Sequence, residues 1–286
     1  MPAHGDLGIQ CFGTQSACDQ PKLMGSGMNI TVLFIHGEWL SAAAWDHFSS
    51  RYRACGYTCI APPWPLSEGP PERLREAPHT DFPRLGITQI IEHYAALIRR
   101  MPQPPLLIGH SLGGLLVQIL LDRGLGCAGV SITAMPPRGL VPRLSILYKA
   151  IPMRMAWGSW KRVMYFPLRE FAQLTRVLAI QDLSLLHASH IVPAPGRIFF
   201  EAAFGIGTHV DFANDYRAPL LLIAAENDHS IRPCLVTSNY RQYNRSAAST
   251  SFKCFAGHSH WLIAEPGWEQ IADYTIEWAQ TQLGRF

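Results

Sequence analysis

The chain has 286 residues, enough for one large α/β domain with a sizeable core, and no break in composition favours two smaller domains. Its formal net charge of +3 is too small to indicate nucleic-acid binding, and no zinc-finger or RNA-binding motif is present. No apolar stretch approaches the length of a membrane span.

Cysteine usage and the N-terminal segment bear on the compartment. The cysteines are odd in number and form no Cys-x-x-Cys pair, which favours thiols in a reducing compartment over a disulfide framework or a metal site. Residues 1–28 lack the basic start and apolar block of a signal peptide, so we interpret them as a disordered leader, with Met24 or Met28 as candidate true starts. These features predict a cytoplasmic protein.

Strand and helix patterns alternate along most of the chain. The predicted strands are continuous apolar runs at 30–35, 58–61, 104–108, 129–134, 220–225 and 252–255. The predicted helices are amphipathic segments at 41–54, 88–100, 112–122, 233–243 and 268–280. A proline-rich stretch from residue 62 to Pro83 is interpreted as a long surface loop. The alternation predicts a doubly wound, mostly parallel sheet.

The alternation stops at residue 138 and resumes near Pro219. The intervening sequence is rich in Met, Trp, Tyr and Phe, and its helical spacing and prolines predict several short helices inserted above the sheet. We therefore divide the chain into a core at 29–137 and 216–286 and a helical lid at 138–215. The apolar lid residues favour an apolar acyl or aromatic ligand, although packing of the lid on the core would use the same residues.

Seven basic residues occur in the lid before any acidic one. They are Arg138, Arg143, Lys149, Arg154, Lys161, Arg162 and Arg169. This run is either a solvated face or a feature that attracts anionic substrates or the surface of an acidic membrane.

One short motif carries the chemistry. Gly109 to Gly113 spell Gly-x-Ser-x-Gly, with a predicted strand before the motif and a predicted helix after it. A nucleophile elbow requires that context, because the chain must turn sharply between strand and helix and lift Ser111 above the sheet. The helix N-terminus then offers free N–H groups to an oxyanion. The alternative is a glycine-rich loop before a packing helix.

An activated serine needs a base, and the base needs an acid that orients it. In an open parallel sheet these groups lie in loops beyond the carboxyl ends of strands. Asp228 follows one predicted strand and His260 follows the next. The order Ser111, Asp228, His260 is the one expected of an α/β-hydrolase.

From Asn29 to the C-terminus the chain resembles the α/β-hydrolase superfamily. The matching motifs are His36-Gly37-Glu38-Trp39 with Trp45, Gly109-His110-Ser111-Leu112-Gly113-Gly114, Asn227-Asp228-His229, and Ser259-His260-Trp261-Leu262 before Glu265-Pro266. The His-Gly loop is similar to that of plant methyl-ester esterases and hydroxynitrile lyases. The C-terminal motifs, with Gly267-Trp268-Glu269, resemble a bacterial branch of hydrolases.

The resemblance implies further roles. Position in the elbow and in the first loop makes the backbone N–H groups of Leu112 and Glu38 the oxyanion donors. Many relatives have a small residue at position 38, and a carboxylate aimed at an oxyanion would hurt catalysis. We therefore expect the Glu38 side chain to point away or to bind a polar group of the substrate. Trp39, His110 and Met135 are expected to contact the substrate.

Each assignment has an alternative. His258 competes with His260 as the base, but His260 matches the family pattern next to Trp and six residues before proline. Glu226 competes with Asp228 as the acid, or is a surface turn residue. His36 is expected to support the oxyanion loop structurally rather than to take part in catalysis.

The sequence predicts a serine carboxylic ester hydrolase that acts on small or medium apolar esters through an acyl-enzyme. No metal-ligand cluster or nucleotide motif is visible, so no cofactor is expected. Two alternatives remain open. The same triad could perform hydroxynitrile cleavage, carbon–carbon bond hydrolysis, acyl transfer or perhydrolysis, or the scaffold could be a non-catalytic receptor. The expected partner is a small-molecule ester, with weak contact between the basic lid and anionic surfaces; the sequence does not specify an oligomeric state.

Overall fold

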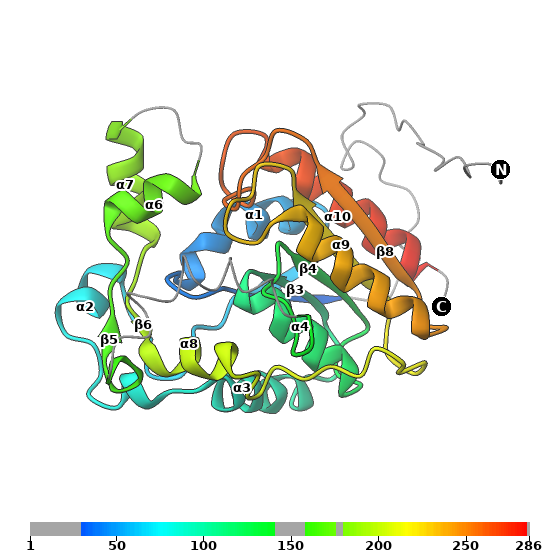
Figure 1. The fold of residues 1–286 in the computed structure, drawn as a ribbon. Coiled ribbons are helices and arrows are strands. Elements are labelled where there is room, and N and C mark those ends of the chain that lie inside the picture. Colours follow the sequence, from blue (N-terminus) through cyan, green and yellow to red (C-terminus); the bar gives the residue numbers. More distant parts are fainter. Residues whose placement is uncertain (1–29, 141–157, 176–179, 285–286) are drawn as a thin grey trace, which may run out of the picture.

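A computed structural model describes residues 30–140, 158–175 and 180–284 (Figure 1). Six strands form one sheet in the order β2-β1-β3-β4-β7-β8, and every neighbouring pair is parallel. The strands are β1 Thr31–Ile35, β2 Thr58–Ile60, β3 Leu106–His110, β4 Ala128–Ile132, β7 Leu220–Ala225 and β8 Thr250–Phe255. The predicted fold class, a doubly wound parallel sheet, is confirmed.

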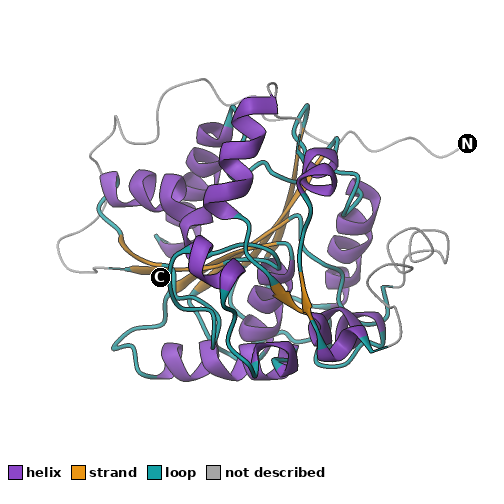
Figure 2. Ribbon diagram, turned by 90° about the vertical axis from the view of Figure 1, so that its left-hand side faces the viewer, coloured by secondary structure: helices purple, strands orange, loops and turns teal. Residues whose placement is uncertain are grey.

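Helices cover both faces of the sheet (Figure 2). They include α1 Asp46–Ala54, α3 Ile87–Arg99, α4 Leu112–Asp122, α9 Pro233–Gln242 and α10 Trp268–Leu283. Helices α1 and α10 lie together, joined by the ion pair of Arg51 with Asp273 at 2.7 Å. Helix α4 is linked to α9 by a buried hydrogen bond from Asn239 to Gln118 at 2.9 Å.

The central strands explain why the sequence folds this way. Strands β3, β4 and β7 are buried at every residue because helices cover both of their faces. A strand in that position needs an apolar side chain toward each face, which is why these segments are continuous apolar runs and do not alternate. The parallel arrangement brings the carboxyl ends of β1, β3, β7 and β8 to one edge of the sheet, where the site is built.

Two expectations are wrong in part. The proline-rich loop contains helix α2, Pro71–Glu76, and a 3₁₀ turn, Phe82–Arg84. Pro71 starts a helix because the first helical position needs no N–H donor, so the proline there is a start signal rather than a breaker. The expectation of free thiols throughout fails at Cys55, which is disulfide-bonded, whereas Cys59, Cys127, Cys234 and Cys254 are free.

The segment between β4 and β7 carries short helices, on the left of Figure 1. Its elements are a 3₁₀ turn Ser159–Lys161, strands β5 Val163–Met164 and β6 Ala194–Pro195, and helices α6 Leu168–Leu174, α7 Ile180–His190 and α8 Gly196–Ala203. The sequence pattern did not predict the two-residue antiparallel pairing of β5 with β6. None of the helices in the described ranges combines the length and hydropathy needed to cross a membrane.

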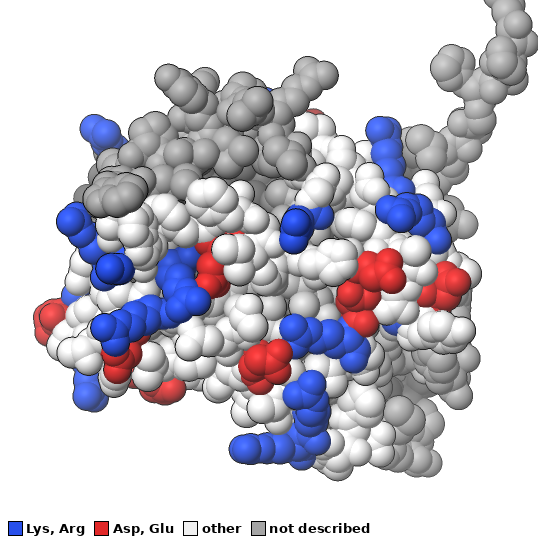
Figure 3. Space-filling view, turned by 60° about the horizontal axis from the view of Figure 1, so that its bottom comes forward, with Lys and Arg blue, Asp and Glu red and all other residues white. Residues whose placement is uncertain are grey.

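Part of the predicted leader and lid lies outside the described residues: all of 1–28, and Arg143, Lys149 and Arg154 of the basic run. The remaining members, Arg138, Lys161, Arg162 and Arg169, are exposed. On the face seen in Figure 3, basic side chains are interspersed with acidic ones, as on an ordinary solvated surface.

Candidate active site

Ser111 lies in a strained turn between β3 and α4. Its φ of 57° and ψ of −119° are unusual for a residue with a side chain, and such strain is characteristic of functional sites. Two glycines make the turn possible. A Cβ on Gly109 would lie 2.1 Å from the carbonyl oxygen of Gly113, and a Cβ on Gly113 would lie 2.1 Å from that of Ile35. The predicted strand–turn–helix geometry is therefore present around Ser111.

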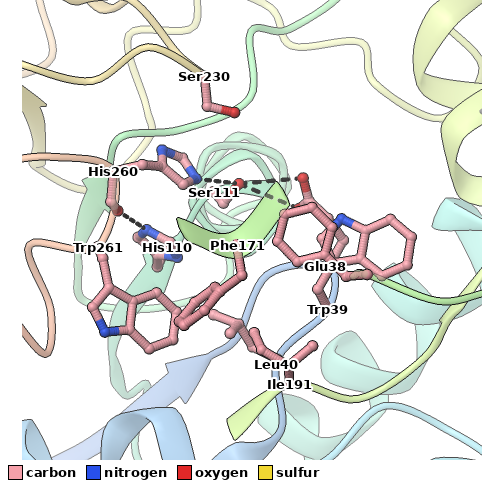
Figure 4. A pocket seen from close by; sticks show the side chains of 11 residues that line it. Glu38, Trp39, Leu40, His110, Ser111, Phe171, Ile191, Ser230, His260 and Trp261 are labelled. Carbon is pink, nitrogen blue, oxygen red and sulfur yellow. Dashed lines mark hydrogen bonds between the residues drawn. The ribbon is translucent and has the colours of Figure 1, made fainter. Parts of the chain in front are cut away.

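The structure brings the three predicted side chains together (Figure 4). His260 Nε2 lies 3.1 Å from Ser111 Oγ, and His260 Nδ1 lies 2.7 Å from Asp228 Oδ2. The other Asp228 oxygen accepts the backbone N–H groups of Ser230 and Ile231 at 2.7 and 2.8 Å. Asp228 is thus fixed from both sides and fully engaged, the arrangement in which a carboxylate orients an imidazole.

The charge environment favours the imidazolium form of His260. Burial by itself lowers the pKa of His260, but the carboxylates of Asp228, Glu38 and Glu265 together outweigh burial and raise this pKa above its ordinary value. A histidine that accepts a proton from a serine needs such stabilisation of its charged form.

The two rival residues have other partners. His258 Nδ1 lies 2.9 Å from Glu265 Oε1, and Glu226 accepts the backbone N–H of Gly257 at 2.8 Å. Neither therefore takes the position beside Ser111 and His260. Both instead hold the loop between β8 and α10, from which His260 projects.

Glu38 points into the site. Its Oε2 lies 3.2 Å from Ser111 Oγ and accepts the backbone N–H of Leu112 at 3.2 Å, while its Oε1 lies 3.4 Å from Ser111 Oγ. Of the two orientations expected for this side chain, pointing away is wrong, and binding a polar group of the substrate stays a prediction. The reason is local: Gly37 packs so closely on Ser111 that a Cβ there would lie 2.9 Å from Ser111 Cβ, and the next side chain is directed at the elbow.

The loop that carries Glu38 is attached to the segment between β4 and β7. The Trp39 ring is stacked between the rings of Phe166 and Phe199, with centroids 5.2 and 4.9 Å away. Trp39 also accepts the backbone N–H of Val192 at 2.8 Å, and Leu40 forms an antiparallel bridge with Ile191. Trp39 has a positive φ of 67°, so its backbone is held in an uncommon conformation by these contacts.

A small pocket opens beside Ser111. Its volume is about 30 Å³, room for about two water molecules. Its lining is mostly aromatic and aliphatic: Glu38, Trp39, Leu40, His110, Ser111, Phe166, Phe171, Ile191, Ser230, His260 and Trp261. Within the described part of the chain, no lysine or arginine belongs to this lining. Phe166, Phe171 and Ile191 were not singled out by the sequence, although aromatic residues in an inserted segment are the signal that could have found them.

Three residues were expected to contact the substrate. Trp39 and His110 line the pocket, whereas Met135 does not belong to that lining and instead donates its backbone N–H to the carbonyl of Ser111 at 3.1 Å. His110 donates through Nε2 to the carbonyl of His260 at 2.8 Å. Burial, reinforced by the neighbouring His260, lowers the pKa of His110 to about 3, so its ring is neutral.

His36 lies beneath the oxyanion loop. It donates from Nδ1 to the carbonyl of Gly37 at 2.9 Å and stacks on Trp64 with the ring centroids 4.9 Å apart. Burial lowers the pKa of His36 to about 4, which keeps it neutral. These contacts are those of a residue that supports the loop from below.

A parallel sheet with helices on both faces, a serine on a nucleophile elbow and a histidine and aspartate at the next strand ends define an α/β-hydrolase fold. The chain belongs to the alpha/beta hydrolase family, whose model matches residues 32–273. No curated protein matches the chain by sequence.

Solved structures support the same fold assignment. A monoacylglycerol lipase from Paleococcus ferrophilus is 15% identical, with a TM-score of 0.63 over 88% of this chain and 94% of that one. A structure from work on carboxylesterases of Nitrososphaera gargenis is 12% identical, with a TM-score of 0.67 over 90% and 92%. A variant of tomato methylketone synthase I complexed with β-ketoheptanoate is 14% identical, with a TM-score of 0.63 over 90% and 100%. At these identities the likeness concerns the fold.

Proposed function

We propose that this protein is a serine carboxylic ester hydrolase that uses Ser111, His260 and Asp228. The observation that carries the proposal is the continuous hydrogen-bonded chain from Asp228 through His260 to Ser111, at a pocket and at the carboxyl ends of parallel strands. Esterase and lipase structures among the fold neighbours agree with it.

The reaction follows from this geometry. Ser111 attacks the carbonyl carbon of an ester while His260 takes the hydroxyl proton, and Asp228 stabilises the imidazolium that results. His260 then returns the proton to the leaving alcohol, which leaves an acyl group on Ser111. Water, deprotonated by the same histidine, hydrolyses the acyl-enzyme and restores the serine.

The developing oxyanion needs donors beside Ser111. The backbone N–H of Leu112, at the N-terminus of α4, is one, and by position in the loop the N–H of Glu38 is the other. Each such donor contributes about 3 kcal/mol to the stabilisation of a transition state. The Glu38 carboxylate holds the Leu112 N–H in the free protein, so it must leave before the ester reacts.

The pocket favours small or medium apolar esters. Its walls are rings and aliphatic side chains contributed by the core and by the segment that we propose to act as the lid. The pocket is small, with a volume of about 30 Å³ against about 300–1,000 Å³ for typical ligand pockets, which favours small acyl groups.

The test is an ester panel of graded acyl length, combined with a fluorophosphonate probe that labels activated serines. We expect hydrolysis and labelling in the wild type, and loss of both in Ser111→Ala. Ser238→Ala on α9 is the matched control, because it removes a serine hydroxyl far from the pocket, and it should retain both. A wild-type protein that neither reacts with the probe nor hydrolyses an ester would support the alternative of a non-catalytic receptor.

Triad chemistry other than ester hydrolysis is the second candidate, and the chemical nature of the products separates it from the first. Simple esters must yield free acid and alcohol in equal amounts. Formation of a transferred ester, a peracid or a cleaved carbon–carbon bond, without that stoichiometry, would assign the triad to one of the other reactions.

A further inference from the structure

Glu38 occupies the place that a reaction intermediate needs. The same carboxylate oxygen accepts the Leu112 N–H and lies within hydrogen-bond distance of Ser111 Oγ, each at 3.2 Å. If Ser111 attacks an ester, the negative oxygen that forms must take this N–H. A carboxylate and an oxyanion repel each other in so confined a site, so the two cannot share the donor.

The resting contact also competes for the proton of Ser111. A hydroxyl donates one hydrogen, which it can direct to His260 Nε2 or to the Glu38 carboxylate but not to both. Only the first arrangement is ready for proton transfer to the base. Glu38 therefore competes with His260 for the proton of Ser111 until something displaces it.

The displacement must come from rotation of the side chain. Gly37 is packed against Ser111, and Trp39 is clamped by two stacked rings and by a hydrogen bond from Val192. The backbone on both sides of Glu38 is therefore fixed. The carboxylate turns about its own bonds, and it stays within a few ångströms of the reacting carbonyl.

The displaced carboxylate then needs a new donor. Among the described residues the lining of the pocket is mostly rings and aliphatic chains, with no lysine or arginine, and no lysine or arginine forms an ion pair with Glu38. A carboxylate without a partner in such surroundings is costly. Apart from His260, the donors among the described lining residues are neutral groups such as the Ser230 hydroxyl, and a charged donor on the substrate couples the release of Glu38 to binding.

We propose that Glu38 is a specificity-determining residue that selects esters with an amino or ammonium group on the carbon next to the scissile carbonyl. This inference rests on the proposed ester hydrolysis. A nitrogen on that carbon, two bonds from the carbonyl carbon, lies where the rotated carboxylate can reach it.

The experiment compares two esters that differ only in the amino group, phenylalanine methyl ester and methyl 3-phenylpropanoate. The measured quantity is the ratio of their kcat/KM values in the wild type, in Glu38→Gln and in Glu38→Leu. Glutamine keeps the shape of the side chain and removes its charge, whereas leucine removes both the charge and the hydrogen-bonding group. Intrinsic reactivity of the two esters cancels when ratios are compared between enzymes. Glu72→Gln, on the surface helix α2, is the matched control.

The expected result is a ratio that favours the amino ester in the wild type and in Glu72→Gln. In both Glu38 variants the ratio should fall about ten- to a hundredfold, because this is the change in rate that corresponds to the loss of one hydrogen bond to a charged group. Activity on methyl 3-phenylpropanoate should rise in Glu38→Leu, because the oxyanion donor is then free.

A ratio that is unchanged or larger in both Glu38 variants overturns the inference. So does a wild type that reacts with the fluorophosphonate probe but prefers the ester without nitrogen. Release of free acid from at least one of the two esters keeps these outcomes distinct from failure of the proposed function, because a protein that is not an ester hydrolase would hydrolyse neither ester.

Discussion

Replacing Glu265 with glutamine is expected to lower both the stability of the protein and the rate of ester hydrolysis. Glu265 is only 5% exposed. It accepts the backbone N–H of Ser259 at 2.7 Å and the Ser259 hydroxyl, and it pairs with His258 Nδ1 at 2.9 Å. One carboxylate thus fixes the residues directly before His260.

The structure sets the size of the stability effect. Glutamine keeps one oxygen acceptor but replaces the other by an NH₂ donor, which faces groups that already donate. Loss of one charge-assisted hydrogen bond costs about 1.5–3 kcal/mol. In a chain of 286 residues, a loss of about 2 kcal/mol lowers the melting temperature by about 3 °C.

The effect on catalysis appears in the pH profile. The Glu265 carboxylate helps to raise the pKa of His260, and the base must be neutral to accept a proton, so activity rises as the pH passes through this pKa. Without the charge at position 265 the pKa falls, and the acid limb of kcat/KM moves to lower pH. The plateau rate falls as well, because the loop holds His260 less well.

The assay is a set of kcat/KM values for one ester from acid to neutral pH, together with a thermal melt of the same preparation. A glutamine variant that melts lower but keeps the wild-type acid limb and plateau would show that Glu265 only stabilises the loop. That result would refute the assignment of Glu265 as a positioning residue for His260.

Three further substitutions probe the site. Asp228→Asn should reduce kcat by a factor of about 10⁴, because the imidazole of His260 loses its orienting acceptor. Glu226→Gln should retain most of the activity. Equal losses of kcat in the two variants would contradict the assignment of Asp228 as the acid. In His258→Ala the loss of kcat should be far smaller than the roughly 10²- to 10⁴-fold loss that removal of a general base causes. A loss of kcat within that range would identify His258 as the base. Gly113→Ala places a Cβ 2.1 Å from the Ile35 carbonyl oxygen and should destabilise folding by about 3 kcal/mol or more; an unchanged denaturant midpoint would contradict the elbow geometry.

The sequence predicts those parts of the fold that depend on local pattern. The run 220–225 is continuous and apolar and is closed by Pro219 and Glu226, and β7 has these bounds. Helix α2 was missed because a proline at a helix start and a proline in a loop look alike without the three-dimensional context. The β5–β6 pairing was missed because two-residue strands leave no periodicity to detect.

For the candidate site, the sequence supplies residue types but not directions. The order of Ser111, Asp228 and His260 could be read because each follows a recognisable strand, and parallel strands end at one edge. The direction of the Glu38 side chain depends on how closely Gly37 approaches Ser111 across the sheet, and no local pattern encodes that distance. The same holds for Phe171, whose place beside the pocket depends on the path of a segment far away in the chain.

The site is therefore held from two independent sides. Ser111 and His260 are fixed by the parallel sheet, whereas the loop with Glu38 is fixed by the segment between β4 and β7, through the stacking of Trp39 between Phe166 and Phe199. A change in that segment can shift the Glu38 carboxylate without moving the nucleophile or the base. Because the Glu38 carboxylate accepts the Leu112 N–H, the proposed ester hydrolysis predicts that changes in this segment alter which esters react and leave the proposed roles of Ser111, His260 and Asp228 unchanged.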